Sequence, residues 1–388
     1  MSTRTLVPIT RPTLPKLGAI QPQLKEILAS GQLTNGKYVR EFEHRYAEKY
    51  GIKHTVAMSS CTDGLTWVMK YFPEGEIILP SFTFCATGNA AHLAGHKLVF
   101  ADCDPRTCNL DPDEVATRVS SRTQAIVATY VYGNPPDLTR LSALARKHRV
   151  KLILDAAHAT GAVYRGKYAG SLAWAEVFSL TPTKVLCCGE GGIVATSDGK
   201  LAEFLKLARE YGNPGDYNTR FVGTNARMEE FNAILGLEGL KQIDRFIAAR
   251  NRLARRYTSA LKQCPGISIP LIEPDCLCTY KDYTIIVDPD VVPFDRDRLA
   301  EYLISCGIEV RRYFFPPLHR QKAFVDLGYG NARHLKNTDY LSRNCLSLPM
   351  FSHMTVKDID LVANTIHEFS SGMKSTSGSP PALLRRRR

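Results

Sequence analysis

The chain reads Phe178-Ser179-Leu180-Thr181-Pro182-Thr183-Lys184, and Gly189-Glu190-Gly191-Gly192 follows shortly after. Upstream, residues 150–155 read Val-Lys-Leu-Ile-Leu-Asp, which predicts a short buried strand that ends in an acid. Open α/β sheets bind ligands at the carboxyl ends of their strands. We therefore expect Asp155 and Lys184 to share one site.

A lysine and an acid placed in this way suit the chemistry of pyridoxal 5'-phosphate. The lysine amine forms a Schiff base with the cofactor aldehyde, and the acid keeps the pyridine nitrogen protonated, so that the ring accepts electrons. By itself, a lysine in a loop is most often a solvated surface charge. The combination of Lys184 with Asp155 favours the cofactor site.

Two further segments provide candidates for binding the cofactor phosphate. Ser179 lies five residues before Lys184, and Thr62 and Asp63 lie where Ser59-Ser60-Cys61-Thr62-Asp63-Gly64 opens a predicted helix. The amides at a helix N-terminus bind phosphate well. The alternative interpretation of this segment is an ordinary N-cap without a ligand.

Short apolar strands alternate with helices over the first two thirds of the chain, which predicts an open α/β sheet. The expected strands are 76–79, 97–100, 125–129, 151–154, 175–180 and 193–196, and the expected helices are 39–50, 64–71, 138–148 and a long one at 229–261. A strand at 280–287, a helix at 295–306 and a strand at 309–312 then predict a smaller α+β domain. We expect a large domain over 1–245, a small domain over 246–370, and a disordered basic tail over 371–388.

The chain resembles the DegT/DnrJ/StrS family of sugar aminotransferases, which have the aspartate aminotransferase fold (fold type I). The resemblance runs from about Leu33 to Phe369. The matching segments are Leu33-Thr34-Asn35-Gly36 with Phe42-Glu43, Ser60 to Leu65, Pro80-Ser81-Phe82-Thr83-Phe84, Asp155-Ala156-Ala157-His158, Phe178 to Lys184, Glu190-Gly191-Gly192, Asn225-Ala226-Arg227-Met228, Pro317-Leu318-His319 and Leu346-Ser347-Leu348-Pro349-Met350.

The resemblance implies a role for each matched residue. Lys184 would form the Schiff base and Asp155 would pair with the pyridine nitrogen. The remaining cofactor contacts would be Ser179 and the amides of Thr62 and Asp63 at the phosphate, Phe84 and His158 at the ring, and Asn225 reaching the phosphate from the partner subunit of a homodimer. The aromatic and proline-rich loop 313–319 reads by default as a structural turn, but the resemblance places its Tyr313 and His319 near the acceptor.

Some positions depart from the family pattern. Cys61 replaces the usual glycine or alanine before the phosphate-binding threonine, and His158 stands where glutamine is frequent. The histidine could stack on the ring, donate to the phenolic oxygen or move protons. Cys187 and Cys188 are expected to serve packing.

The lysine at position 184 also indicates the reaction. Related sugar 3-dehydratases have a histidine there, so Lys184 favours transamination, with pyridoxamine 5'-phosphate as the intermediate form of the cofactor. The resemblance implies glutamate or glutamine as the donor and a keto-sugar, nucleotide-linked and deoxygenated, as the acceptor. A cyclitol or another carbocyclic ketone is an alternative acceptor, and a non-catalytic regulatory or binding protein of the same fold is a second alternative.

Composition sets broader limits. The 388 residues include eleven cysteines without a Cys-x-x-Cys pair, which favours reduced thiols in the cytoplasm. Cys276-Leu277-Cys278 is weak evidence for a metal, so no metal site is predicted. Neither a signal peptide pattern nor an apolar run of membrane-spanning length is apparent. Of the net charge of +12, Lys374 and Arg385 to Arg388 supply five. We predict no nucleic acid partner from this tail, which lacks an aromatic platform.

Overall fold

The computed structural model describes residues 6–332 and 334–375 and contains one large sheet and two smaller ones. The strand order of the large sheet is β1-β9-β8-β5-β4-β2-β3. Its members are β1 (His54–Met58), β2 (Glu76–Pro80), β3 (Lys97–Ala101), β4 (Thr123–Thr129), β5 (Lys151–Asp155), β8 (Ala175–Ser179) and β9 (Gly192–Thr196). Strands β3, β2, β4, β5 and β8 are parallel, β9 runs against them, and β1 pairs antiparallel with β9. The predicted α/β class with a mostly parallel central sheet is confirmed.

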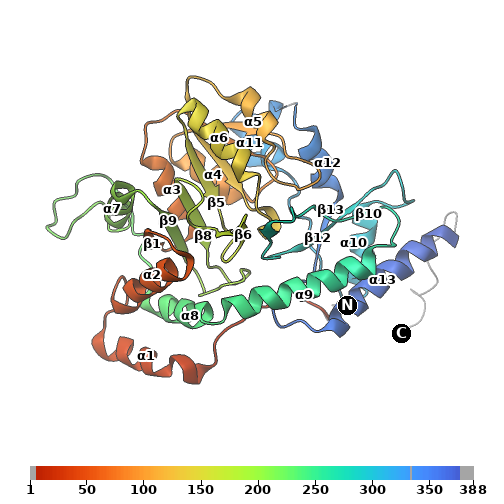
Figure 1. Cartoon of the computed structure of the whole chain (residues 1–388), viewed down its shortest axis with the longest axis horizontal. Coiled ribbons are helices and arrows are strands. Elements are labelled where there is room, and N and C mark those ends of the chain that lie inside the picture. Colours follow the sequence, from red (N-terminus) through yellow and green to blue (C-terminus); the bar gives the residue numbers. More distant parts are fainter. Residues whose placement is uncertain (1–5, 333, 376–388) are drawn as a thin grey trace.

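Helices cover both faces of this sheet (Figure 1) because the strands are apolar on both sides. Along β4, Ile126 and Ala128 contribute to one core, and Ala125 and Val127 contribute to the other. The first core is covered by α2 (Lys37–Tyr50), α5 (Pro112–Arg118), α6 (Leu138–His148) and α8 (Glu230–Leu240), and the second by α3 (Cys61–Lys70), α4 (Cys85–Leu93) and α7 (Gly199–Ala208). Helix α1 (Leu17–Ser30) packs on the outer side of α8.

A smaller antiparallel sheet with helices against it forms the C-terminal part of the molecule (Figure 1). Its strands are β10 (Ile267–Ser268), β12 (Tyr283–Val287) and β13 (Cys345–Leu348), and its helices are α9 (Ile243–Leu261), α10 (Arg296–Ser305) and α13 (Val356–Ser375). The third sheet joins β6 (Val163–Tyr164), β7 (Lys167–Tyr168) and β11 (Cys276–Leu277). Shorter helices are η1 (Val131–Gly133), η2 (Leu318–Arg320), α11 (Lys322–Asp326), η3 (Tyr329–Asn331) and α12 (Lys336–Asn344).

Helix α9 connects the two parts. Ile243 and Ile247 pack into a core of the large sheet, whereas Leu253 and Tyr257 pack into the core of the small one. The N-terminal segment also lies with the small sheet, because Val7 pairs with Ile308. Both contacts cross the domain boundary that we expected at residue 245.

Three local predictions were wrong. The helix expected at 229–261 is broken into α8 and α9, because the amide of Gln242 bonds to Gly239 O, three residues back, and tightens the turn. Within the strand expected at 309–312, Arg311 alone forms a β-bridge, with Ser347, and the preceding residue Ile308 bridges to Val7 instead. Helix α13, with Phe369 buried in the small core, continues through 371–375, where we expected disorder. The rest of the predicted tail, 376–388, lies outside the described residues.

None of the helices in the described ranges combines the length and the apolar character needed to cross a membrane.

Glu230 joins the N-terminus of α2 to the first turn of α8. Its carboxylate, 2% exposed, accepts hydrogen bonds from the amides of Gly36 (2.8 Å), Tyr38 (2.8 Å) and Val39 (3.0 Å). The N-cap residue of α2 is Gly36, which has no side chain that could accept these hydrogen bonds. A Cβ on Gly36 would lie 2.9 Å from the carboxylate, so this close approach requires glycine. The carboxylate thus caps α2 from a helix almost two hundred residues away.

We predict that Glu230→Ala destabilises the protein by about 3 kcal/mol, because several buried amides lose their acceptor. The measurement is the urea midpoint of the cofactor-free protein. Glu229→Ala is the matched control, since the neighbouring acid is exposed and its side chain caps nothing. Equal midpoints for the two variants would contradict this role of Glu230.

Candidate active site

A cavity of about 350 Å³ lies where three neighbouring parallel strands end. Thr129, Asp155 and Ser179 are the last residues of β4, β5 and β8, and all three line it. The other lining residues are Ser60, Cys61, Thr62, Thr83, Phe84, Ala86, Tyr130, Val131, Ala157, His158, Thr181, Thr183, Lys184, Glu190, Lys281, Asp282, Tyr313 and Phe314. The structure therefore brings together most of the residues that the sequence indicated, from segments far apart in the chain.

Asp155 is a buried carboxylate held by neutral donors. The Thr87 hydroxyl donates to Oδ2 (2.6 Å), and the Ala157 amide donates to Oδ1 (3.1 Å). Burial raises the pKa of Asp155 above its usual value, and the bond from Thr87 opposes this shift. Among the described residues no ion pair neutralises this carboxylate. Thr87 orients it from helix α4, a role that the sequence analysis missed.

Lys184 follows β8 on a loop whose backbone is fixed at several points. Its amide bonds to Thr181 O (3.0 Å), and Leu180 is bonded both to Gly191 (2.9 Å) and to Cys188 (2.9 Å). The side chain faces the cavity. Although the residue keeps some access to solvent, burial of the amine, aided by the charge of Lys281, lowers the pKa of Lys184 to about 8. A substantial share of this amine is neutral near physiological pH.

The N-terminus of α3 points its first amides at the cavity. The Ser60 hydroxyl accepts a bond from the Asp63 amide (3.0 Å) and donates to the Asp63 carboxylate (2.7 Å), which orders the turn. The amides of Cys61 and Thr62 have no partner within the described ranges. A Cβ on Gly192 would lie 2.7 Å from the Cys61 nitrogen, so β9 approaches this turn closely only because residue 192 is glycine.

His158 lies inside the cavity, whereas Phe84 lies at its exposed edge. His158 follows β5 and lines the cavity, and burial, with Lys184 and Lys281 nearby, lowers the pKa of its imidazole well below the usual value. The imidazole is therefore neutral at physiological pH. Phe84 precedes α4, and its side chain is 57% exposed at the cavity edge.

The small sheet completes the cavity with residues that the sequence analysis did not select. Lys281 and Asp282 precede β12, are each 5% exposed and form an ion pair of 2.9 Å. The Lys281 ammonium also lies 5.0 Å from the centre of the Tyr313 ring. A charged pair at the start of an apolar strand was the signal that could have identified them.

Three predicted site residues do not line this cavity. The first is Asp63, whose amide was expected at the phosphate but is bonded to the Ser60 hydroxyl. His319 is 1% exposed behind the cavity wall, where its Nδ1 is 2.7 Å from the Ser81 hydroxyl and its Nε2 is 3.4 Å from the Asp339 carboxylate. It ties the 313–319 loop to the end of β2. Asn225 is exposed, pairs through its backbone with Glu210, and is not part of this cavity.

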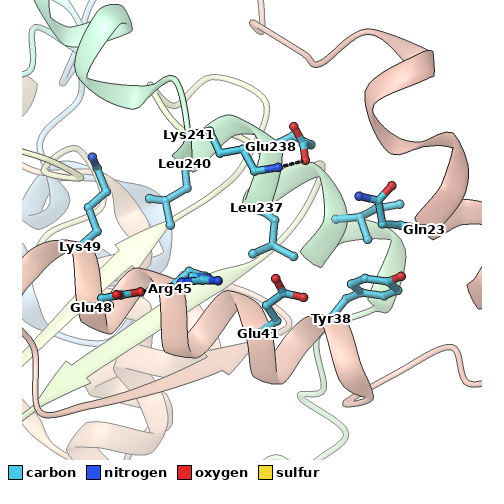
Figure 2. A pocket seen from close by; sticks show the side chains of 11 residues that line it. Gln23, Tyr38, Glu41, Arg45, Glu48, Lys49, Leu237, Glu238, Leu240 and Lys241 are labelled. Carbon is cyan, nitrogen blue, oxygen red and sulfur yellow. Dashed lines mark hydrogen bonds and ion pairs between the residues drawn. The ribbon is translucent and has the colours of Figure 1, made fainter.

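A larger hollow of about 550 Å³ lies between helices α1, α2 and α8 (Figure 2). Salt bridges on its walls join Arg45 to Glu48 and Lys241 to Glu238. It contains none of the predicted site residues. Lys49, also on its wall, pairs with Asp244, so most of its charged groups are engaged in ion pairs and the strand-end cavity is the better candidate for chemistry.

Comparison with known proteins agrees with this geometry. Residues 17–367 match the model of the DegT/DnrJ/EryC1/StrS aminotransferase family. Among similar solved structures, the crystal structure of DesI in the presence of its TDP-sugar product superposes with a TM-score of 0.89 at 34% identity, covering 95% of this chain and 94% of that one.

Two curated relatives are similarly close. A UDP-2-acetamido-2-deoxy-3-oxo-D-glucuronate aminotransferase from Pseudomonas aeruginosa is 32% identical over 88% of this chain and 94% of its own length. A protein named pleiotropic regulatory protein from Geobacillus stearothermophilus is 32% identical over 89% of this chain and 93% of its own length.

We predict that the Lys184 amine of the cofactor-free protein titrates with a midpoint near pH 8, because burial disfavours its charged form. The measurement is the rate of labelling by an amine-reactive reagent as a function of pH, followed by mass spectrometry of the peptide that contains Lys184. Ordinary surface lysines, with midpoints of about pH 10.4, serve as internal controls. A midpoint for Lys184 equal to theirs would contradict the buried site.

Proposed function

The chain belongs to the DegT/DnrJ/EryC1/StrS aminotransferase family, and from this premise we propose that it uses pyridoxal 5'-phosphate to move an amino group from glutamate or glutamine to the ketone of a nucleotide-linked deoxysugar. The observation that carries the proposal is the placement of the Lys184 amine and the Asp155 carboxylate in one strand-end cavity. The residues of this cavity, taken one by one, fit that cofactor.

The cavity offers complementary groups for each part of the cofactor. Asp155 is a buried carboxylate without a cationic partner among the described residues, which suits a protonated pyridine nitrogen. The hydroxyl of Thr129, 4% exposed, has no hydrogen-bond partner in the described part of the chain and is therefore free to bind a ligand oxygen or nitrogen. The unpaired amides of Cys61 and Thr62 suit a phosphate.

The cofactor would accordingly be held from several sides. We assign the phosphate to the α3 amides of Cys61 and Thr62 and to the Ser179 hydroxyl, with Asp63 ordering the turn. Phe84 and His158 would flank the ring. Asn225 of a partner subunit would complete the phosphate site in a homodimer, which accounts for its exposed position away from the cavity of its own chain.

The bound cofactor supplies an electrophilic aldehyde and a ring that accepts electrons. Lys184 contributes the nucleophile and, once released, the general base: its amine, with a pKa of about 8, takes the proton from the donor's α-carbon and later delivers a proton to the carbon of the acceptor. Asp155 stabilises a proton on the ring nitrogen by its negative charge. The neutral imidazole of His158 donates or accepts a hydrogen bond without adding charge.

Two properties support the acceptor and the compartment. The charge of the chain without its basic tail stays positive, which suits an anionic sugar nucleotide. No disulfide joins the eleven cysteines, all of which lie in the described part of the chain, and this supports a reducing compartment such as the cytoplasm.

We predict that protein loaded with pyridoxal 5'-phosphate shows a visible Schiff-base absorption band that disappears when L-glutamate or L-glutamine is added, with growth of the near-ultraviolet band of pyridoxamine 5'-phosphate. Lys184→Ala should lack the lysine-dependent band, lose turnover, and still bind cofactor through the phosphate and ring contacts. The measurement is the absorption spectrum before and after each donor, followed by a panel of keto-sugars and cyclitol ketones. Full turnover by Lys184→Ala would refute the assignment.

We predict that neither Lys184→Ala nor Asn225→Ala is active alone and that a mixture, dissociated and reassociated, recovers about a quarter of wild-type activity, because half of the random dimers contain one intact site. The measurement is amino transfer after mixing, with size determination by light scattering. A mixture no more active than its components would exclude a site shared in this way.

A further inference from the structure

We propose that Lys281 is the binding residue for the α-carboxylate of the amino donor, and that Asp282 holds its ammonium group in position until the carboxylate arrives. The inference rests on the proposed function and adds to it a residue for donor recognition. The pair lies at the start of β12, in the part of the cavity wall that comes from the small sheet.

The charges that line the cavity leave few candidates for this task. The lysines among the lining residues are Lys184 and Lys281, and no arginine is among them. Lys184 reacts at the amino group and is therefore not available to bind the carboxylate. The imidazole of His158 is neutral. A donor carboxylate buried without a cation would carry a large desolvation cost, so Lys281 is the group that can offset it.

Lys281 also lies close to the reacting atom. Its charge is the largest influence on the Lys184 amine after burial itself, and it acts on His158 as well. In an amino acid, the carboxylate is bonded to the same carbon that gives up its proton to Lys184. An anion-binding group for the donor must therefore lie near that amine, as Lys281 does.

The main chain around Lys281 is held rigidly. Arg250, 2% exposed, donates to the carbonyl groups of Tyr280 (2.9 Å) and Lys281 (3.2 Å). Just before them, the Thr279 hydroxyl donates to His158 O (2.6 Å), which fixes this segment against the large sheet. A binding group on such a support keeps its position when a ligand enters.

The lysine side chain is held by two contacts that a ligand can replace in part. Asp282 accepts from the ammonium through both carboxylate oxygens, at 2.9 and 3.1 Å, and the Tyr313 ring lies under the charge. An ammonium group has three donors. The remaining capacity of Lys281 can therefore serve a donor carboxylate while Asp282 prevents the free enzyme from burying an unpaired cation.

The experiment compares two ligands with the carbon skeleton of glutamate and no amino group: glutarate, which is charged, and pentanediamide, which is neutral. Their dissociation constants are measured by calorimetry on protein loaded with pyridoxal 5'-phosphate. We expect Lys281→Met to weaken glutarate about 10- to 100-fold and to leave pentanediamide nearly unchanged. Lys281→Arg should retain much of the preference for glutarate.

Two further variants keep the test decisive. Lys322→Met is the matched control, since Lys322 is 88% exposed and pairs with Asp326 on the surface. If Lys281→Met folds poorly with Asp282 left unpaired, the double variant Lys281→Met/Asp282→Asn removes both charges and is expected to show the same loss of glutarate binding.

A second readout needs neither cofactor nor turnover. Removing the charge of Lys281 should raise the labelling midpoint of Lys184 in the cofactor-free protein above about pH 8, whereas Lys322→Met should not change it. Unchanged glutarate binding in both Lys281 variants would overturn the inference. Wild-type protein that transfers no amino group from any donor would instead contradict the proposed function, so the two failures are distinguishable.

Discussion

The candidate active site depends on one energetically unfavourable arrangement, two lysine amines buried in the same cavity. Burial and the charge of Lys281 both lower the pKa of Lys184, which leaves a substantial share of its amine neutral near physiological pH, as the proposed chemistry requires. Asp282 forms an ion pair with Lys281 at 2.9 Å, which offsets the cost of burying this second amine. The loop that contains Lys184 is fixed to β9 and its neighbours by backbone bonds, so the two amines are kept in place despite their repulsion.

This arrangement requires both parts of the molecule. Lys184 and Asp155 come from ends of the large sheet, whereas Lys281 and Asp282 come from the small one. Helix α9 packs into both cores, and Arg250, near its middle, bonds to the carbonyl group of Lys281. Helix α9 therefore both joins the two parts and, through Arg250, positions Lys281, the second cation of the site.

Most of the large sheet was predictable because its strands are continuous apolar runs separated by turns. Strand β1 was not among the predicted strands, and α8 and α9 were predicted as one helix. Their periodicity is nearly continuous. The break lies at Gln242, where the chain tightens into a three-residue turn, and α9 then extends from the core that it shares with α8 to the core of the small sheet. The segment 309–312 has strand-like residues, but its neighbours in space are Val7 and Ser347, which local sequence does not specify.

The sequence by itself determined the α/β class, the aminotransferase family and the prediction that Lys184 and Asp155 share one cavity, because these follow from strand patterning and from motifs in a fixed order. Only the tertiary structure placed Thr87 on the Asp155 carboxylate, oriented the free amides of α3 toward the cavity, and buried His319 behind it. It also brought Lys281 to Lys184 across almost a hundred residues of chain. Such contacts arise from the packing of one part of the fold against another. Electrostatic effects depend on distance and burial in space, not on separation along the chain, so they could not be predicted from the sequence.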